Sequence, residues 1–228
     1  MKVKVLEWDS NFFNKKIGVI EIEEEIGILL DFEGLDLIYV KQIENEHFEA
    51  KGFKEAYADT KVVFSKSISK SNNLLKGFIF SAFDTDINRE QIYKLAYESG
   101  KFSRFKLDNN FQKHEFEALY KRWVDNSFSK EYADAILVYK DNSAILGFIT
   151  YKIFKNYATI CLIAVCVTHQ GKGIGSALLK AVENELANTF VKELRIPTQL
   201  QNEQACGFYT KLGYNIIEKT IIKHYWRL

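Results

Sequence analysis

A glycine-rich turn between a buried run and an amphipathic helix constrains this chain more than any other feature. The turn is Gln170-Gly171-Lys172-Gly173-Ile174-Gly175, and it separates the apolar run 158–167 from apolar residues at helical spacing over 174–186. Its glycines leave successive backbone N–H groups uncovered at the start of a helix, which creates a binding site for an anion. The sequence therefore predicts a strand, a phosphate-binding turn and a helix in succession.

Two common phosphate-binding turns do not match this spacing. The dinucleotide-binding fingerprint requires a glycine at position 176, where Ser176 stands. A P-loop requires Ser or Thr after its Gly-Lys pair, whereas Lys172 is followed by Gly173. The turn therefore belongs to another class of anion site.

The order of the remaining elements predicts the fold class. From residue 77 onward the patterns indicate a strand, a helix over 84–99, a second helix around residues 116–124 and strands at 135–139, 144–153 and 157–167. After the glycine-rich helix follow a strand at 193–196, a helix at 202–212 and two strands up to residue 228. Short turns make an antiparallel meander the simplest connection of the middle strands. We expect an α/β (α+β) fold with a mixed, mostly antiparallel central sheet flanked by helices.

The first seventy residues repeat part of this order. Residues 35–40, the pairs Asn45-Glu46 and Gly52-Phe53, and residues 61–65 parallel 193–196, Asn202-Glu203, Gly213-Tyr214 and 220–226. The parallel predicts an N-terminal domain over 1–72 that is a truncated copy of part of the domain over 73–228. Residues 65–73, rich in Ser, Lys and Asn, would link the two domains. The first domain lacks a glycine-rich turn, so we expect it to bind no cofactor.

The charge and composition of the chain indicate which kinds of binding partner to expect. A net charge of +1 over 228 residues does not favour nucleic acid. No apolar run approaches the roughly 20 residues that cross a bilayer, so we expect no membrane insertion and a cytoplasmic enzyme. The three cysteines, at 161, 166 and 206, have neither the count nor the spacing of a disulfide framework or a zinc site, so no metal is expected. The C-terminal run 216–226 offers a pairing edge and favours a homodimer.

Two motifs resemble those of the GNAT superfamily of acetyltransferases. Gln170, Gly173 and Gly175 match its Gln-x-x-Gly-x-Gly pattern, and residues 202–214 are similar to its Asn-x-x-Ala-x-x-x-Tyr-x-x-x-Gly-aromatic signature. The element order from residue 77 is also similar, so the resemblance covers about two thirds of the chain. It implies a GNAT fold with an N-terminal truncated GNAT-like half domain, acetyl-CoA as co-substrate and direct N-acetyl transfer.

The resemblance also implies roles for individual residues. Backbone groups near Val165 and Val167 would pair with the pantetheine arm and polarise the thioester. Tyr209 would protonate the leaving thiolate, although its position also suits a core aromatic residue. The implied cofactor-binding residues are Val165, Val167, Gln170, Gly171, Lys172, Gly173, Ile174, Gly175, Ser176, Asn202 and Tyr209.

Several of these residues have alternative interpretations. Asn202 is equally a helix N-cap, and Lys172 equally a solvated side chain. The sequence does not decide which group acts as the general base, and the candidates are Glu98, Glu131, Asp134 and a chain of waters.

A narrower resemblance concerns the acceptor. Residues 6–13, the segment Phe102-Ser103-Arg104-Phe105 and residues 194–199 are similar to segments of the dTDP-fucosamine acetyltransferases. This similarity implies acetylation of a nucleotide-linked amino sugar, a dTDP-4-amino-4,6-dideoxyhexose, with Arg104 paired to the diphosphate and Phe102 or Phe105 stacked on a base or sugar. An acetyltransferase of proteins, polyamines or aminoglycosides, or a CoA-binding module without catalysis, remains an alternative.

Overall fold

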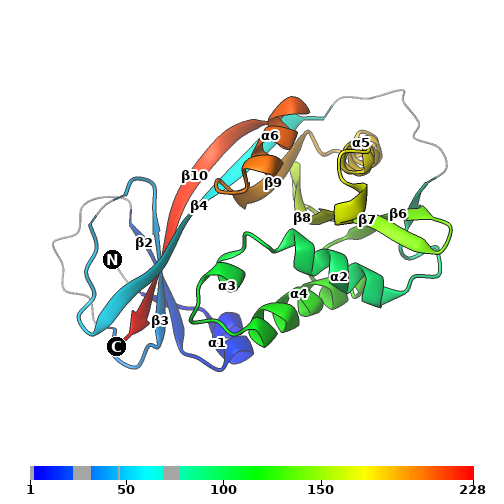
Figure 1. The fold of residues 1–228 in the computed structure, drawn as a ribbon. Helices are drawn as coiled ribbons and strands as arrows, with labels where there is room; N and C mark the ends of the chain where they lie inside the picture. Colours follow the sequence, from blue (N-terminus) through cyan, green and yellow to red (C-terminus); the bar gives the residue numbers. More distant parts are fainter. Residues whose placement is uncertain (1–2, 23–31, 46, 69–77) are drawn as a thin grey trace.

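The computed structural model describes residues 3–22, 32–45, 47–68 and 78–228, which form a ten-stranded sheet with helices on both faces (Figure 1). The strand order is β1-β2-β3-β10-β4-β9-β8-β7-β6-β5. The strands are β1 (Lys4–Val5), β2 (Ile17–Ile22), β3 (Leu37–Gln42), β4 (Phe53–Ser67), β5 (Ile79–Ser81), β6 (Ala135–Asp141), β7 (Ala144–Ile153), β8 (Tyr157–Val165), β9 (Glu193–Gln199) and β10 (Asn215–Arg227). The helices are α1 (Glu7–Phe13), α2 (Arg89–Ser99), α3 (Arg104–Leu107), α4 (Lys113–Phe128), α5 (Ile174–Leu186) and α6 (Glu203–Lys211), with a 3₁₀ turn, η1, at Val167–His169.

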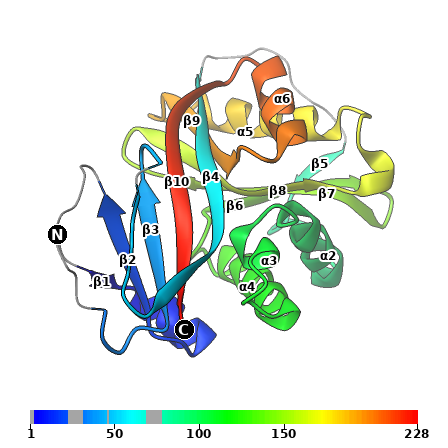
Figure 2. The same cartoon turned by 60° about the vertical axis from the view of Figure 1, so that its left-hand side comes forward.

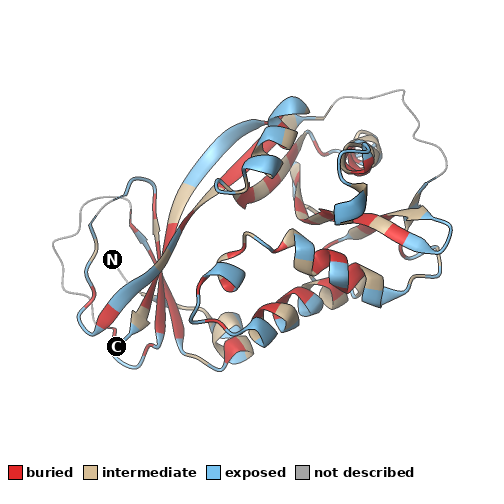
Figure 3. Cartoon of the chain, in the orientation of Figure 1, coloured by how far each residue is buried: buried red, intermediate tan, exposed pale blue. Residues whose placement is uncertain are grey.

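Helices α2 and α4 cover one face of the sheet, and α5 and α6 lie on the other (Figure 1). Each face of the sheet has its own hydrophobic core, because successive side chains of a strand point to opposite faces. On β7, Phe148 joins the core under α2 and α4, whereas the next residue, Ile149, joins the core under α5 and α6. Buried and exposed residues form bands along α2 and α4, as expected of helices with one face against a sheet (Figure 3).

Local signals explain where the helices begin and end. The side chain of Asn88 accepts a hydrogen bond from the backbone N–H of Glu90 and starts α2, so the expected start near residue 84 is too early. The expected end at Gly100 is correct, and a Cβ there would lie 2.4 Å from the ring of Tyr120. Gln112 and Glu115 form a reciprocal capping box at the start of α4.

The strands that follow α6 in the sequence differ from expectation. A single strand, β10, follows α6, and the expectation of two strands there is wrong. The neighbour of β10 on the side toward β9 is β4, whose residues 53–65 pair antiparallel with residues 215–227 of β10 (Figure 2). β4 also pairs with β9, from Lys61 opposite Gln199 to Ser67 opposite Glu193. The strand between β9 and β10 is therefore supplied by residues from the first third of the chain.

The expected linker is wrong at its beginning, because β4 continues through Ser67. Residues 69–73 of that linker, and Glu46 of the repeated pair, lie outside the described residues.

Strand pairing follows the same order in the two parts of the chain. β2 pairs parallel with β3 as β8 does with β9, and β1 pairs antiparallel with β2 as β7 does with β8. At the centre of the sheet, β10 from the C-terminal part of the chain pairs with β3, and β4 from the N-terminal part pairs with β9. Each part of the chain therefore pairs with one strand from the other part. The division into domains 1–72 and 73–228 stays a prediction.

No helix of the described residues is long and apolar enough to cross a membrane. Within those same residues, no group of three or more His, Cys, Asp or Glu side chains is placed to hold a metal ion. All three cysteines are free and half-buried.

Candidate active site

The glycine-rich turn has the backbone that its sequence requires. Gly171 and Gly173 have φ angles of +76° and +84°, a left-handed region that side chains other than glycine rarely adopt. Gly173 is the N-cap of α5, and a Cβ built on either glycine meets nothing within 4 Å. The first turn of α5 therefore opens onto free space, where an anion can reach the uncovered N–H groups.

Two other residues fix this turn against its surroundings. A Cβ on Gly175 would lie 3.2 Å from Phe208 and 3.7 Å from Val165, so a glycine here lets α5 approach α6 and the end of β8 closely. The amide of Gln170 donates to the carbonyl of Val165 at 3.2 Å, and Gln204 of α6 donates to Gln170 at 3.2 Å. Gln170 thus ties β8 to α6 across the turn.

Strands β8 and β9 separate beside the turn. They pair only from Tyr157 opposite Glu193 to Thr159 opposite Arg195, and beyond these residues the edge of β8 that faces β9 has no strand partner within the described sheet. The register of β7 and β8 shifts after Ile160, which leaves Cys161 as an extra residue. Such a bulge twists a strand and re-aims its side chains. The free edge of β8 can therefore accept hydrogen bonds from an extended ligand.

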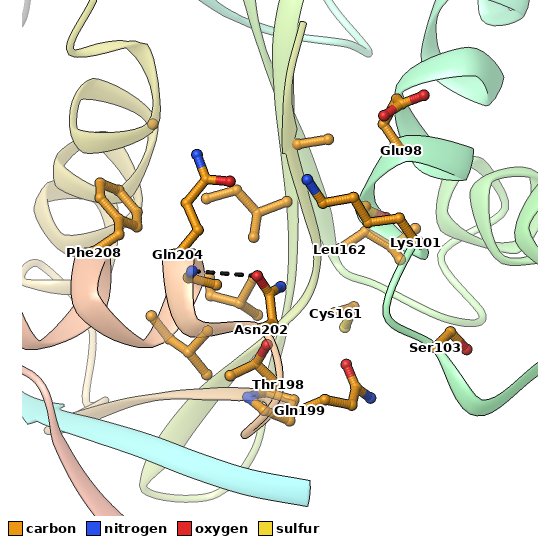
Figure 4. A pocket seen from close by; sticks show the side chains of 18 of the residues that line it. Glu98, Lys101, Ser103, Cys161, Leu162, Thr198, Gln199, Asn202, Gln204 and Phe208 are labelled. Carbon is orange, nitrogen blue, oxygen red and sulfur yellow. Dashed lines mark hydrogen bonds between the residues drawn. The ribbon is translucent and has the colours of Figure 1, made fainter. Parts of the chain in front are cut away.

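A pocket of about 900 Å³ lies between the separated strands. In Figure 4, side chains of α6 and β9 face Glu98 and Lys101 of the α2 end across the pocket, with Cys161 and Leu162 of β8 between them. Aromatic rings of α3 and α4 line its other side, among them Phe105, Tyr120 and Trp123. The pocket thus extends from the glycine-rich turn on one face of the sheet to the aromatic helices on the other.

Tyr209 of α6 is one of the residues that line this pocket. It is 4% exposed, and burial raises the pKa of its phenol above the usual range. Its ring lies 5.5 Å from that of Phe64, so it is also part of the core. A phenol in this setting stays protonated at neutral pH and is able to act as an acid.

Most of the predicted site residues gather at the pocket. Those that line it are Val165, Gln170, Gly171, Gly173, Ile174, Gly175, Ser176, Asn202, Tyr209, Arg104 and Phe105. The side chain of Asn202 caps α6 by accepting from the N–H of Ala205 at 3.3 Å, so it has a structural function as well as its place in the pocket wall.

Three predicted residues do not line the pocket: Val167, Lys172 and Phe102. The expected end of the strand at Val167 is wrong, because β8 ends at Val165 and Val167 lies in η1 with 58% of its surface exposed. The roles given to these three residues stay predictions.

Among the carboxylates considered as general base, only Glu98 lines the pocket. Asp134 instead accepts from the backbone N–H of Ile153 at 2.6 Å, beside the β7–β8 turn. Two other carboxylates line the pocket, Asp9 of α1 and Asp59 of β4, and the sequence analysis did not select them. Asp9 lies in the segment 6–13 singled out in the sequence, but Asp59 belongs to no local motif, so only the folded chain brings the two together at this site.

Comparison with known proteins agrees with this geometry. A model of the acetyltransferase (GNAT) family matches residues 91–214, which is more than half of the chain. The chain belongs to this family. As a GNAT acetyltransferase it is an acetyl-CoA-dependent N-acetyltransferase, and its open turn and free strand edge suit the pyrophosphate and the pantetheine arm of that co-substrate.

Individual relatives of this GNAT acetyltransferase are distant. The [ribosomal protein bS18]-alanine N-acetyltransferase of Escherichia coli K12 is 28% identical over 106 residues, covering 46% of this chain and 70% of the relative. N-alpha-acetyltransferase 30 of Schizosaccharomyces pombe is 26% identical over 100 residues, covering 42% and 67%. A GCN5-related N-acetyltransferase from Sphaerobacter thermophilus has a similar fold, with a TM-score of 0.52 at 14% identity over 83% of this chain and 60% of the other.

Proposed function

We propose that this GNAT acetyltransferase transfers the acetyl group of acetyl-CoA to the amino group of a nucleotide-linked amino sugar, a dTDP-4-amino-4,6-dideoxyhexose. The observation that carries the proposal is the pocket, which joins an anion-binding turn to a chamber walled by aromatic rings and charged side chains. A concave, mostly apolar wall with a few convergent polar groups is typical of sites for small molecules. The resemblance of residues 6–13, 102–105 and 194–199 to the dTDP-fucosamine acetyltransferases supports the same acceptor.

The proposed reaction assigns a task to each part of the pocket. The turn from Gln170 to Gly175 holds the pyrophosphate, and the free edge of β8 near Val165 holds the pantetheine amides. The acceptor nitrogen attacks the thioester carbonyl carbon, the C–S bond breaks, and the thiolate takes the proton of Tyr209. The phenolate of Tyr209 then regains a proton from water, which balances the proton that the acceptor releases. The acceptor loses one proton to a base, for which Glu98 and waters in the pocket are the candidates.

Release of free CoA thiol from acetyl-CoA tests the acceptor class. The purified protein is assayed with dTDP- and UDP-linked amino sugars, spermidine and a peptide with an N-terminal alanine. Turnover confined to a nucleotide-linked amino sugar is the expected result. Turnover with spermidine or the peptide alone would reject the amino sugar, and CoA binding without any turnover would favour a module without catalysis.

A protein N-terminus is the second candidate acceptor. One relative is named as an alanine N-acetyltransferase of ribosomal protein bS18 and another as an N-alpha-acetyltransferase. The peptide arm of the same assay decides between this candidate and the amino sugar.

A further inference from the structure

An exposed tryptophan stands in the wall of the pocket. Trp8 of α1 lines the pocket and is 46% exposed, whereas the other aromatic residues that line it are buried or half-buried. The indole is stacked on the ring of Phe12, with the ring centres 5.1 Å apart and the planes 6° apart. Among the described residues, no second ring stacks on Trp8, and it belongs to none of the hydrophobic cores. The exposed part of the indole is therefore available to a flat ligand.

The two aromatic residues that the sequence suggested for stacking are not available in this way. Phe102 does not line the pocket. Phe105 lines it but is only 7% exposed, because Phe13 is stacked on its ring with the ring centres 5.4 Å apart. The guanidinium of Arg104 also lies 4.8 Å from the ring centre of Phe105. A ligand stacked on Phe105 would have to displace one of these two side chains.

Trp123 of α4 is the second tryptophan in the pocket wall, and other rings surround it. Tyr132 is stacked on Trp123 with the ring centres 5.4 Å apart. Tyr120 and Phe105 meet it edge-on, at 4.7 Å and 6.2 Å. Trp8 is therefore the aromatic side chain of the described pocket wall that is best placed to stack on a ligand.

The position of α1 decides which part of the acceptor reaches Trp8. α1 packs against α3 through the rings of Phe13 and Phe105, on the face of the sheet away from α5 and α6 (Figure 1). The turn that would hold the pyrophosphate of acetyl-CoA is at the start of α5, so Trp8 lies at the other end of the pocket. In a nucleotide-linked sugar, the diphosphate separates the sugar from the base. A sugar whose amine meets the thioester therefore extends its base toward Trp8.

We propose that the exposed indole of Trp8 binds the nucleobase of the acceptor by stacking. This inference rests on the proposed function, because the occupant is taken to be a nucleotide-linked sugar. Every base has a flat aromatic face, so the contact holds the nucleotide without selecting one base. Trp8 takes the role that the sequence suggested for Phe102 or Phe105, and α1 becomes part of the acceptor site.

Binding of dTDP, which carries the base and the diphosphate but no amine, tests the inference without any turnover. The affinities for dTDP and for inorganic pyrophosphate are measured by phosphorus NMR in the presence of saturating CoA, which occupies the glycine-rich turn. The variants are Trp8→Leu, which keeps an apolar side chain against Phe12, and Trp8→Phe, which keeps a ring. Phe154→Leu is the matched control, because Phe154 is 41% exposed and stacked on Tyr157 at 4.8 Å but lies outside the pocket wall.

We expect Trp8→Leu to bind dTDP about tenfold more weakly than the wild-type protein, since the stacking of a base on an aromatic side chain has an effect of this order. Trp8→Phe should retain most of the affinity, and the control should retain all of it. Unchanged dTDP affinity in Trp8→Leu, an equal loss of affinity for pyrophosphate, or no dTDP binding to the wild-type protein would each overturn the proposal.

The indole signals of the wild-type protein give a second readout. The chain has three tryptophans, and the proton–nitrogen spectrum of Trp8→Phe identifies the indole N–H signal of Trp8 by its absence. We expect dTDP to shift this signal in the wild-type protein, because a stacked base changes the ring current at the indole. A shift confined to the signals of the other two tryptophans would place the base elsewhere and reject the assignment.

Kinetics distinguish failure of this inference from failure of the proposed function. With a nucleotide-linked amino sugar as acceptor, Trp8→Leu should raise KM about tenfold with a much smaller change in kcat, because the base is stacked equally in the bound state and the transition state. Acetylation of that sugar with an unchanged KM would reject Trp8 and leave the proposed function standing. Binding of dTDP that depends on Trp8, without acetylation of any nucleotide-linked amino sugar, would reject the proposed function and leave the base site standing.

Discussion

A phenol on α6 protonates a thiolate only if it keeps its own proton at neutral pH. An ordinary phenol, with a pKa of about 10, already meets this condition, and burial raises the pKa of Tyr209 further. We expect Tyr209→Phe to lower turnover by about 10²-fold or more while leaving the affinity for acetyl-CoA nearly intact, because only the proton donor is lost. Steady-state kinetics and a binding isotherm measure the two effects.

Tyr214→Phe is the matched control for this change. Tyr214 is also buried on the same side of the sheet, but its hydroxyl donates to Glu183 at 2.7 Å and it does not line the pocket. We expect it to lower the melting temperature without slowing turnover. Equal turnover in Tyr209→Phe and the wild-type protein would remove Tyr209 from the mechanism.

The backbone of Gly173 leads to a second prediction at the residue scale. With φ at +84° and open space beside its Cα, Gly173→Val introduces backbone strain and fills the space in front of the α5 N-terminus. We expect CoA binding to be abolished, as measured by calorimetry. Gly207→Ala, at an exposed position within α6 where a Cβ meets nothing, should bind CoA normally. Normal CoA affinity in Gly173→Val would reject the turn as the cofactor site.

At the scale of elements, β10 is joined to the end of α3 by a buried ionisable pair. His224 Nδ1 lies 2.6 Å from Asp108 Oδ2, which also accepts from Trp226 at 2.8 Å. Burial, the largest effect, lowers the pKa of His224 to about 4, while the hydrogen bonds lower that of Asp108 to about 2 against the effect of burial. The folded state thus holds a neutral imidazole beside an ionised carboxylate.

This pair makes the stability depend on pH. Between about pH 6.5 and pH 4 the unfolded chain protonates the histidine and the folded chain does not, so stability falls as the pH falls. We expect His224 to account for a loss of about 2 kcal/mol in the free energy of unfolding between pH 7 and pH 5. Urea unfolding should show this loss in the wild-type protein and a smaller one in His224→Gln. Parallel pH profiles for the two proteins would contradict the assignment.

At the scale of the whole molecule, the exchange of strands makes the N-terminal residues part of the catalytic sheet. β4 lies between β9 and β10, and it pairs with β10 from Phe53 to Ser65 and with β9 from Lys61 to Ser67. In the fragment 73–228, β10 loses both of its partners, β3 and β4, and β9 loses β4, and the unpaired strand edges that remain promote aggregation. We expect this fragment alone to be insoluble or unfolded, and co-expression with residues 1–72 to restore a soluble protein that binds CoA.

Size-exclusion chromatography and circular dichroism check this expectation. A monomeric, folded fragment 73–228 with normal CoA affinity would show that the catalytic part closes its sheet without β4.

The sequence alone predicted those features of this protein that are coded locally. The turn from Gln170 to Gly175 depends on glycines at left-handed positions and on the helix that follows, so its spacing was sufficient to distinguish it from other phosphate sites. Helices α4, α5 and α6 and strands β6 to β8 follow from periodicity and caps within each segment. The membership of the chain in the acetyltransferase family rests on the same local motifs.

Only the tertiary structure decided which distant segments meet. The alternating pattern of a strand does not encode its neighbour, so nothing in residues 53–67 indicates that they pair with both β9 and β10. Asp59 reaches the pocket by that pairing and Asp9 by the packing of α1, and the local sequence does not indicate that the two carboxylates line one pocket. The proposed cofactor side of the site is coded locally, because a backbone turn would bind the anion, whereas the proposed acceptor side is assembled from side chains that the sheet brings together.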